Sequence, residues 1–594
     1  MLINNKHKGS LRLDWINKDL SLYYEIDEKE GKGVRPVWVP KNDIRVAEPR
    51  ILRYIKTYGD PTSENMLIKG DNLLVLRSLV EMFKGRAEKD KIKCIYIDPP
   101  FNTGNAFEKY DDNLQHSEWL TMMRDRLILL RQLMRKDGVI FVHIDYSELA
   151  YLKVLLDELF SRNNYIAQIN WQRVPEGRTL LGQGQADITV STEYILIYAL
   201  NKKQGLLNKD SKKLTEATDK VLEQYYLILE TSGKKKLVKR FDDIQGNIVE
   251  IYEYSKHELK SMPRKLLRDN KAKYLKLFIN KFNKIVQSVG VQEESSFQQR
   301  IMGCLKSKTK LYSAKYIVSK GKRKGIEAED YFINGRKLLF AKDYCKLDAG
   351  LIYRETDMND FWSNNEIQVT GTAEEGGVTF KRSKKPEALI KRILALASRE
   401  GDVVFDSFAG SGTTGAVAHK MKRRWIMVEL GKHTEDLIIP RLNRVISGKD
   451  NRGISTDKDV NWIKGGGYSY YILGESVIHA RDMNWILKAE EMAEAIFLHF
   501  QYRPVKAAWL EKENLFLGKH QSARFHYAIS FTFREIKVLT EELYEAIVAG
   551  LDKEKFRHLT IFTNVALAVP PESLDARVLV KKIPAAILRE YNLL

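Results

Sequence analysis

The stretch Lys91–Gly104, KIKCIYIDPPFNTG, places a rigid polar corner at the end of an apolar run. Cys94–Ile97 predict a buried strand, and the sequence Asp-Pro-Pro-Phe follows at 98–101. Two prolines fix the backbone and disfavour helical geometry in the residue before each, so the Asp98 carboxylate has a set direction. A carboxylate and a proline carbonyl accept hydrogen bonds from an exocyclic amine, and an aromatic ring stacks on a base. The competing interpretation is a proline turn beneath a packed phenylalanine.

The charge and the cysteine content narrow the class of protein. The chain has 594 residues, a formal net charge of +20 and a pI near 9.4. This excess of Lys and Arg indicates a polyanionic partner, most simply nucleic acid. Cys94, Cys304 and Cys345 have no paired spacing, which argues against a metal site and a disulfide framework. With no signal core and no apolar span of about 18 residues, we expect a cytoplasmic protein without membrane contact.

Strands alternate with helices on both sides of the corner. This alternation predicts an α/β fold with a doubly wound parallel sheet covered by helices on both faces. Ser117 is a plausible N-cap for the helix that follows it. The predicted strands are 94–97, 139–145, 165–173, 192–200, 401–406 and 425–430, and the predicted helices are 73–80, 117–134, 147–160, 385–398, 416–422 and 434–446.

A second motif, DSFAGSGTTG at 406–415, lies between a predicted buried strand and a helix. Its glycines allow a sharp turn and a close approach of the backbone to a ligand. The next strand ends in Glu429, where an acid can accept hydrogen bonds from both hydroxyls of a ribose. Since no Gly-Lys-Ser or Gly-Lys-Thr follows, an ATP phosphate loop is disfavoured, and an adenosine compound without a phosphate tail is the better candidate. The alternative is a purely structural turn.

Together the two motifs resemble the amino-methyltransferases that modify DNA with S-adenosylmethionine. In that family an Asp-Pro-Pro-aromatic corner holds the base, and a Phe-x-Gly-x-Gly loop holds the cofactor. The corner precedes the loop here, with a long variable segment between them, which is similar to the β arrangement of the family. The resemblance implies catalytic residues Asp98, Pro99, Pro100 and Phe101 and cofactor-binding residues Asp71, Lys385, Asp406, Phe408, Gly410, Gly412, Thr413 and Glu429, with no metal.

Within this family the sequence is most similar to modification subunits of type III restriction systems. That similarity rests on Asn102, Thr103 and Gly104 after the corner, on the stretch VHIDYSE ending at Glu148, and on Gly-Gly-Gly-Tyr from Gly465. It implies duplex DNA as substrate, a nuclease or helicase restriction subunit as partner, and a homodimer. Phe101 stands where tyrosine is commoner in the group, so any hydrogen bond from a hydroxyl is lost.

The expected activity is methyl transfer to N6 of adenine after the base has been flipped out of the duplex. Two alternatives stay open. Methylation of N4 of cytosine uses the same amine geometry, although relatives acting on cytosine more often carry serine where Asp98 stands. The chain could instead act chiefly as a DNA-reading subunit that recruits a nuclease or helicase.

The domain organisation follows from changes in composition. We expect an N-terminal extension at 1–60, a split methyltransferase domain at 61–200 and 360–450, and an α+β C-terminal domain at 451–594. Between the halves lies a Lys-rich insertion at 201–359, for which apolar residues at helical spacing predict helices. The resemblance makes this insertion the target-recognition region, although a Lys-rich helix can also be a merely solvated face. In the tail we expect strands at 465–473 and 526–533 and a helix at 484–497.

Overall fold

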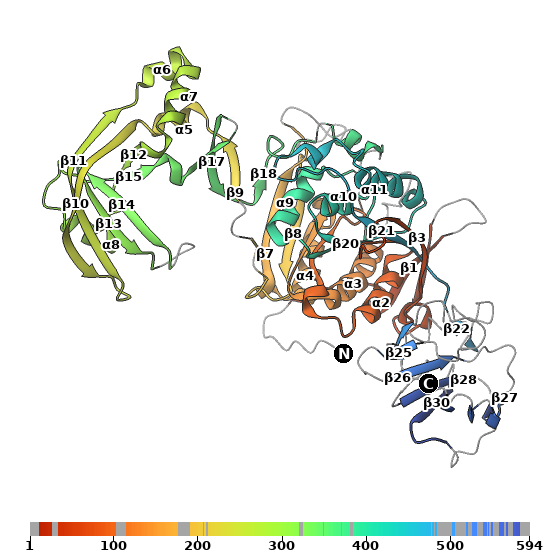
Figure 1. The fold of residues 1–594 in the computed structure, drawn as a ribbon. Coiled ribbons are helices and arrows are strands. Elements are labelled where there is room, and N and C mark those ends of the chain that lie inside the picture. The colour runs from red at the N-terminus through yellow and green to blue at the C-terminus, as the bar shows by residue number, and fades with distance from the viewer. Residues whose placement is uncertain are drawn as a thin grey trace. The chain divides into compact units, whose positions relative to one another are not determined.

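The computed structural model describes residues 11–26, 34–102, 115–175, 190–319 and 325–476, except 206, 209–211, 349, 370 and 380–383, and short segments between 478 and 582. The chain divides into two compact units (Figure 1). Unit 1 comprises Met1–Asn208 and Asn359–Leu594, and unit 2 comprises Lys209–Met358. The insertion expected at 201–359 therefore begins slightly earlier than unit 2.

Unit 1 is organised around a ten-stranded sheet. Its middle six strands, from β6 to β21, pair in parallel, whereas β8 pairs antiparallel with both of its neighbours and β3 pairs antiparallel with β21. In spatial order the strands are β18 (Phe361–Trp362), β7 (Tyr165–Gln172), β8 (Thr192–Ala199), β6 (Met134–Ile144), β5 (Ile92–Ile97), β19 (Val403–Asp406), β20 (Arg424–Glu429), β4 (Met66–Lys69), β21 (Gly467–Leu473) and β3 (Leu52–Gly59).

Helices cover both faces of the sheet, as the alternating pattern predicted (Figure 1). All six residues of β5 are buried, because its side chains alternate between the two faces. Ile95 and Ile97 pack into the core beneath one helix layer, and Cys94 and Tyr96 point the other way. One layer holds α2 (Asn72–Phe83), α3 (His116–Leu133) and α4 (Tyr146–Phe160), and the other holds α9 (Glu387–Ala397), α10 (Thr413–Lys420) and α11 (Ile439–Ile446).

Two expected domain boundaries and one expected helix cap in unit 1 are wrong. The extension expected at 1–60 contributes β3 to the large sheet, and the tail expected from 451 contributes β21, which pairs with both β3 and β4. The strands complete the sheet because their aromatic side chains pack together, as in the stacked pair Tyr58 and Tyr468 with ring centroids 5.0 Å apart. Ser117 is not the N-cap of α3, since the helix begins at His116 and the carboxylate of Glu118 accepts from the Gln115 amide.

Unit 2 is not mainly helical, contrary to the expectation. Its centre is a closed barrel of six strands, with only short helices such as α6 (Arg264–Asp269) and α7 (Lys271–Asn280) (Figure 1). Helical spacing is real in α7, where Tyr274 and Phe278 are fully buried one turn apart. In β11 the buried residues Val249 and Ile251 instead stand on alternate positions, a period of two that the surrounding charges obscured. The barrel strands are β10 (Leu227–Asp242), β11 (Ile248–Ser261), β12 (Ile285–Val289), β13 (Tyr312–Ile317), β14 (Glu327–Ile333) and β15 (Arg336–Phe340).

The C-terminal tail contains a five-stranded sheet that includes β26 (His526–Ser530). The strand expected at 526–533 is thus present over its first five residues. β2 (Val34–Pro40) lies in a separate two-stranded sheet with β1 (Leu20–Ile26), where an edge position tolerates its prolines. The helix expected at 484–497 lies outside the described residues.

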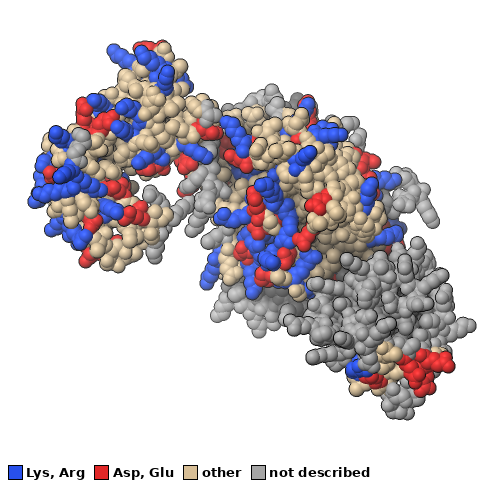
Figure 2. Space-filling view, viewed as in Figure 1, with Lys and Arg blue, Asp and Glu red and all other residues tan. Residues whose placement is uncertain are grey.

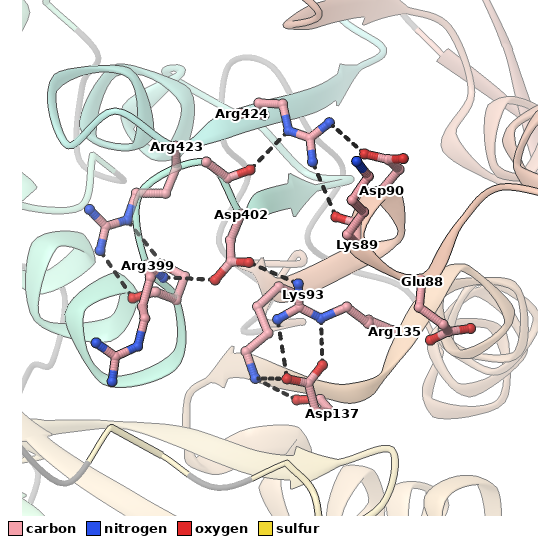
Figure 3. A network of polar contacts seen from close by, with 12 residues as sticks. Glu88, Lys89, Asp90, Lys93, Arg135, Asp137, Arg399, Asp402, Arg423 and Arg424 are labelled. Atoms are coloured by element: carbon pink, nitrogen blue, oxygen red, sulfur yellow. Dashed lines mark hydrogen bonds and ion pairs between the residues drawn. The ribbon is translucent and has the colours of Figure 1, made fainter.

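Charged side chains lock the amino edge of the large sheet together (Figure 3). Arg135, at the start of β6, contacts Asp137 and donates to Asp402 at 2.8 Å before β19. Lys93 in β5 donates to both the carbonyl and the carboxylate of Asp137, at 2.6 and 3.0 Å. Arg424 at the start of β20 donates to Asp90 at 3.1 Å. These contacts join the starts of four neighbouring strands.

Candidate functional site

The opposite, carboxyl edge gathers the acids that the two motifs supply. β4, β20, β19 and β5 are neighbours and run in the same direction. Their ends therefore bring Asp71, Glu429, Asp406 and Asp98 to one edge of the sheet, although these residues are far apart in sequence. Three of the four are almost fully buried, and the side chain of Asp98 is 20% exposed. Binding sites of open α/β sheets lie at this edge.

Asp98 keeps one carboxylate oxygen without a hydrogen-bonding partner among the described residues. Its Oδ2 lies 3.0 Å from Nζ of Lys385, while Oδ1 is buried and unpaired. An unsatisfied buried acceptor is unfavourable by about 1–3 kcal/mol, so it is rare unless a ligand completes it. Oδ1 of Asp98 is thus available to accept a hydrogen bond from a ligand.

The ring of Phe101 is half-buried beside the same lysine. Nζ of Lys385 lies 4.6 Å from the ring centroid, within range of a cation–π interaction. The imidazole of His143 lies at 5.8 Å and is tilted by 37°. Lys385 was predicted to border the cofactor. In the structure its ammonium contacts Asp98 and Phe101, the two side chains that were predicted to hold the base.

Contacts on both sides hold the proline corner. The indole of Trp119 in α3 donates to the Pro100 carbonyl at 2.7 Å. Asn102 has a left-handed backbone with φ of 60°, and its side-chain amide donates to Glu148 at 2.7 Å. Nδ1 of His116 also lies 2.7 Å from Glu148. Burial raises the pKa of Glu148, against the lowering effect of the Asn102 hydrogen bond.

Glu193 is the main residue of this site that sequence reasoning missed. It lies at the start of β8, 5% exposed, where its carboxylate contacts Arg173 and lies 3.5 Å from Lys385 and 2.8 Å from His143. Burial acts to raise the pKa of Glu193, but Lys385, Arg173 and His143 outweigh it, and the pKa is well below its ordinary value. The signal in the sequence was an acid opening an otherwise apolar strand.

The glycine loop has the geometry expected of a ligand cradle. Gly410 and Gly412 have φ of 55° and 74°, in the left-handed region that favours glycine. A Cβ on Gly412 would approach Ile438 to 2.8 Å, whereas a Cβ on Gly410 would meet nothing closer than 3.9 Å. The Thr413 hydroxyl accepts from Arg441 at 2.7 Å, which fixes the start of α10. Phe408 packs at the margin of the hydrophobic core.

The carboxylates of Glu429 and Asp406 accept hydrogen bonds from this loop and fix its backbone. Glu429 accepts from the Gly410 amide at 2.7 Å and from the amides of Leu430 and Gly431. Asp406 accepts from the Phe408 amide at 2.9 Å and from the Thr414 hydroxyl at 2.6 Å. Burial raises the pKa of Asp406 to about 7, despite these two hydrogen bonds.

Asp71 has a structural role in this state. Its Oδ1 accepts from the amides of Leu73 and Leu74 and caps α2, while its Oδ2 accepts from Arg126 at 2.9 Å and from the Tyr24 amide. Both oxygens of Asp71 thus accept hydrogen bonds within the fold. Its predicted contact with the cofactor remains a prediction.

A buried ionic cluster, also missed from sequence, joins the Lys385 segment to the glycine-loop helices. Glu387 accepts from Lys420 at 2.7 Å and from Arg441 at 2.8 Å, and all three side chains are fully buried. Asp450 lies 2.8 Å from Lys420. Because Arg441 also contacts Thr413, the cluster couples the position of Lys385 to the loop.

Two kinds of feature are absent from the described part of the chain. No group of His, Cys, Asp and Glu side chains there could hold a metal ion. None of the helices described there is long and apolar enough to cross a membrane.

Comparisons with known proteins agree with this geometry. A family profile described as DNA methylase matches residues 92–440, which is more than half of the chain. The probable type III restriction-modification enzyme HindVI Mod subunit of Haemophilus influenzae is 36% identical over 429 residues, covering 70% of this chain and 55% of that protein. The EcoP15I Mod subunit of Escherichia coli is 25% identical over 417 residues, covering 63% and 60%.

The chain spans only about half the length of these relatives. Among solved structures, PvuII DNA methyltransferase (cytosine-N4-specific) aligns with a TM-score of 0.31 and 11% identity over 67% of this chain and 92% of that one, a likeness too distant to inform on function. The family profile carries the assignment, and it includes both the corner and the glycine loop. The resemblance drawn from the two motifs is confirmed, and the chain belongs to the DNA methylase family.

Proposed function

We propose that this protein transfers a methyl group from S-adenosylmethionine to N6 of adenine in duplex DNA. The observation that carries the proposal is the buried Oδ1 of Asp98, which has no hydrogen-bonding partner in the described part of the chain and lies at the same sheet edge as the glycine loop. An acceptor for an amine and a cradle for an adenosine compound are thereby supplied by neighbouring strands, β5 and β19.

The residues present fit this cofactor. The left-handed glycines leave open space at Gly410, and Glu429 places a carboxylate at the end of the next strand. Gly410, Gly412 and Glu429 would hold the adenosine part, and the segment that begins at Lys385 would border the methionine part. When bound, the cofactor supplies a methyl group already activated on a positively charged sulfur, so positioning accounts for most of the rate.

The corner would orient the amine. The lone pair of an exocyclic amine is delocalised into the base, which makes the nitrogen a poor nucleophile. Hydrogen bonds to Oδ1 of Asp98 and to the Pro99 carbonyl would favour a more tetrahedral nitrogen with its lone pair available. Phe101 would replace the stacking that the flipped base loses.

Unit 2 is the part we propose to grip the DNA backbone. It contains 33 Lys and Arg against 20 Asp and Glu, a net charge of +13 out of the chain's +20. Figure 2 shows Lys and Arg side chains over α6 and along β10 and β11. Lys265, Lys273 and Lys276 on α6 and α7 are exposed. Such contacts hold a duplex without reading its sequence.

The salt dependence of DNA binding tests the role of these lysines. Changing Lys265, Lys273 and Lys276 to glutamine should reduce the slope of log K against log salt by about 0.9 for each phosphate that the variant no longer neutralises. A control that removes the same charge from unit 1, at exposed Lys84, Lys422 and Lys458, should leave the slope unchanged. Equal effects of the two triple variants would mean that only total charge matters.

We also propose, from the relatives' names, that the protein works in the cytoplasm as the modification subunit of a type III restriction system. Homodimer formation and a nuclease or helicase partner belong to this proposal. Truncation after residue 475 should abolish co-purification with such a partner if the tail recruits it. Retention of the partner by the truncated chain would assign recruitment to another surface.

The deciding experiment is incubation of the purified protein with DNA and labelled S-adenosylmethionine, followed by sequencing that detects N6-methyladenine and N4-methylcytosine. Label at N6 of adenine is the expected result. Label at N4 of cytosine would correct the base, and label in neither would overturn the activity.

A further inference from the structure

We propose that Glu193 is a positioning residue that holds the ammonium of Lys385 between two carboxylates and so keeps one oxygen of Asp98 free for the target amine. The inference rests on the proposed function of Asp98. Neither the motifs nor the family resemblance singled out Glu193, which lies on the antiparallel strand β8 rather than at the end of a parallel strand.

The geometry divides one positive charge between two acids. Nζ of Lys385 lies 3.0 Å from Oδ2 of Asp98 and 3.5 Å from Oε2 of Glu193. The Coulomb energy of two charges is inversely proportional to the distance between them, so the attractions of Lys385 to the two carboxylates are of similar strength. Lys385 and Glu193 are almost fully buried, where water screens little, so the balance between the carboxylates decides where the ammonium sits.

Two further groups fix Glu193 in place. Arg173, which follows β7, contacts its carboxylate, and Nε2 of His143 in β6 lies 2.8 Å from it. Burial, together with the nearby Lys385 charge, lowers the pKa of His143, and the Tyr96 hydroxyl lies 2.9 Å from Nδ1 of the same ring. Residues of neighbouring strands therefore fix the Glu193 carboxylate, whereas the Lys385 ammonium contacts Asp98 directly.

The consequence for the corner is twofold. If Glu193 lost its charge, Lys385 would be attracted to Asp98 alone and would compete with the amine for the carboxylate. The same movement would shift the ammonium across the face of Phe101, from which it now lies 4.6 Å. Acceptor strength and the stacking surface would both change, although Glu193 itself touches neither the base nor the cofactor.

A double-mutant cycle tests this coupling. Glu193→Gln is expected to lower kcat by about tenfold while leaving KM for DNA unchanged, since unit 2 is untouched. In a Lys385→Met background the same change should lower kcat by less than about twofold, because no ammonium remains to be misplaced. An equal loss in both backgrounds, or no loss in either, would overturn the proposal.

Glu193→Asp separates charge from folding. It keeps the carboxylate and is expected to retain at least half of the wild-type kcat, whereas a loss as large as that of Glu193→Gln would contradict the charge argument. If the wild-type protein methylates neither base, the proposed function fails, and the cycle is read in thermal unfolding instead. There the drop in Tm of the double variant should be smaller than the sum of the single drops, and additive drops would refute the coupling.

Discussion

The two edges of the large sheet use buried charge in opposite ways. At the amino edge, both oxygens of Asp402 have partners, the Arg135 guanidinium and the Arg399 amide, each at 2.8 Å. At the carboxyl edge, Oδ1 of Asp98 is buried without a hydrogen bond among the described residues. A satisfied edge stabilises the fold, whereas an edge with an unsatisfied acceptor gives up stability to prepare a binding site.

Because the same strands form both edges, substitutions at one edge can be compared directly with substitutions at the other. Changes at the carboxyl edge should affect activity with little loss of stability, and changes at the amino edge should do the reverse.

The largest effect is expected for Asp98→Ala. It removes the acceptor for the amine, so turnover should fall by at least about a hundredfold, as when a general acid–base or electrostatic group is lost. Cofactor affinity, measured by calorimetry, should remain within about threefold of wild type. Removal of an unsatisfied buried oxygen favours the folded state, whereas loss of the ion pair with buried Lys385 opposes it, so the net loss of stability should be small. Residual methylation at the wild-type rate would show that the corner is not the active site.

Gly412→Ala should have the next largest effect, on cofactor binding. The new Cβ would lie 2.8 Å from Cγ2 of Ile438 on a backbone with φ of 74°. Left-handed geometry alone disfavours alanine by about 1–2 kcal/mol, and the contact adds to it, so we expect the cofactor Kd to rise by about tenfold or more.

Gly410→Ala is the matched control for that variant. It has similar backbone strain, with φ of 55°, but its Cβ would meet only the Phe408 carbonyl oxygen at 3.9 Å, an ordinary van der Waals contact. The increase in Kd should therefore be clearly smaller than for Gly412→Ala. If the two variants bind equally, the contact with Ile438 does not determine the shape of the loop.

The sequence was sufficient for the parts of the site that follow parallel strands. Asp98, Asp406 and Glu429 each end a short apolar run, and parallel strands bring such ends together whatever their separation in sequence. Glu193 could not be placed in the same way, because β8 runs antiparallel and presents its start at this edge. Pairing direction is set by tertiary contacts that no local pattern reports.

The barrel of unit 2 escaped prediction for a different reason. Lysines are common on both helices and exposed strands, so the charge pattern did not distinguish them. Only the buried residues carry the period, as Val249 and Ile251 do on alternate positions of β11, and few of them stand out among the charges. In α7 the helical spacing was correct, and it was wrongly extended to the neighbouring strands.

Asp402→Asn tests the amino edge. The change weakens the contact with Arg135 and is expected to lower the free energy of unfolding by about 1.5–3 kcal/mol, the range for a hydrogen bond to a charged group. Urea denaturation measures this decrease. At a temperature where the variant is folded, kcat should be unchanged; a tenfold drop would mean that the two edges are coupled through the strands.

The smallest expected effect is a dependence of stability on pH from Asp406. Burial raises its pKa to about 7, and an aspartate in an unfolded chain titrates near about 4. Between these values the folded protein holds a proton that the unfolded chain has released, so stability should decrease as pH rises from about 4 to 7. Asp406→Asn cannot titrate, and its urea midpoint should fall less between pH 5 and pH 8 than that of the wild type. Asp402→Asn retains Asp406 and should show the full wild-type decrease. Equal decreases in wild type and Asp406→Asn would show that a group other than Asp406 takes up the proton and causes the dependence of stability on pH.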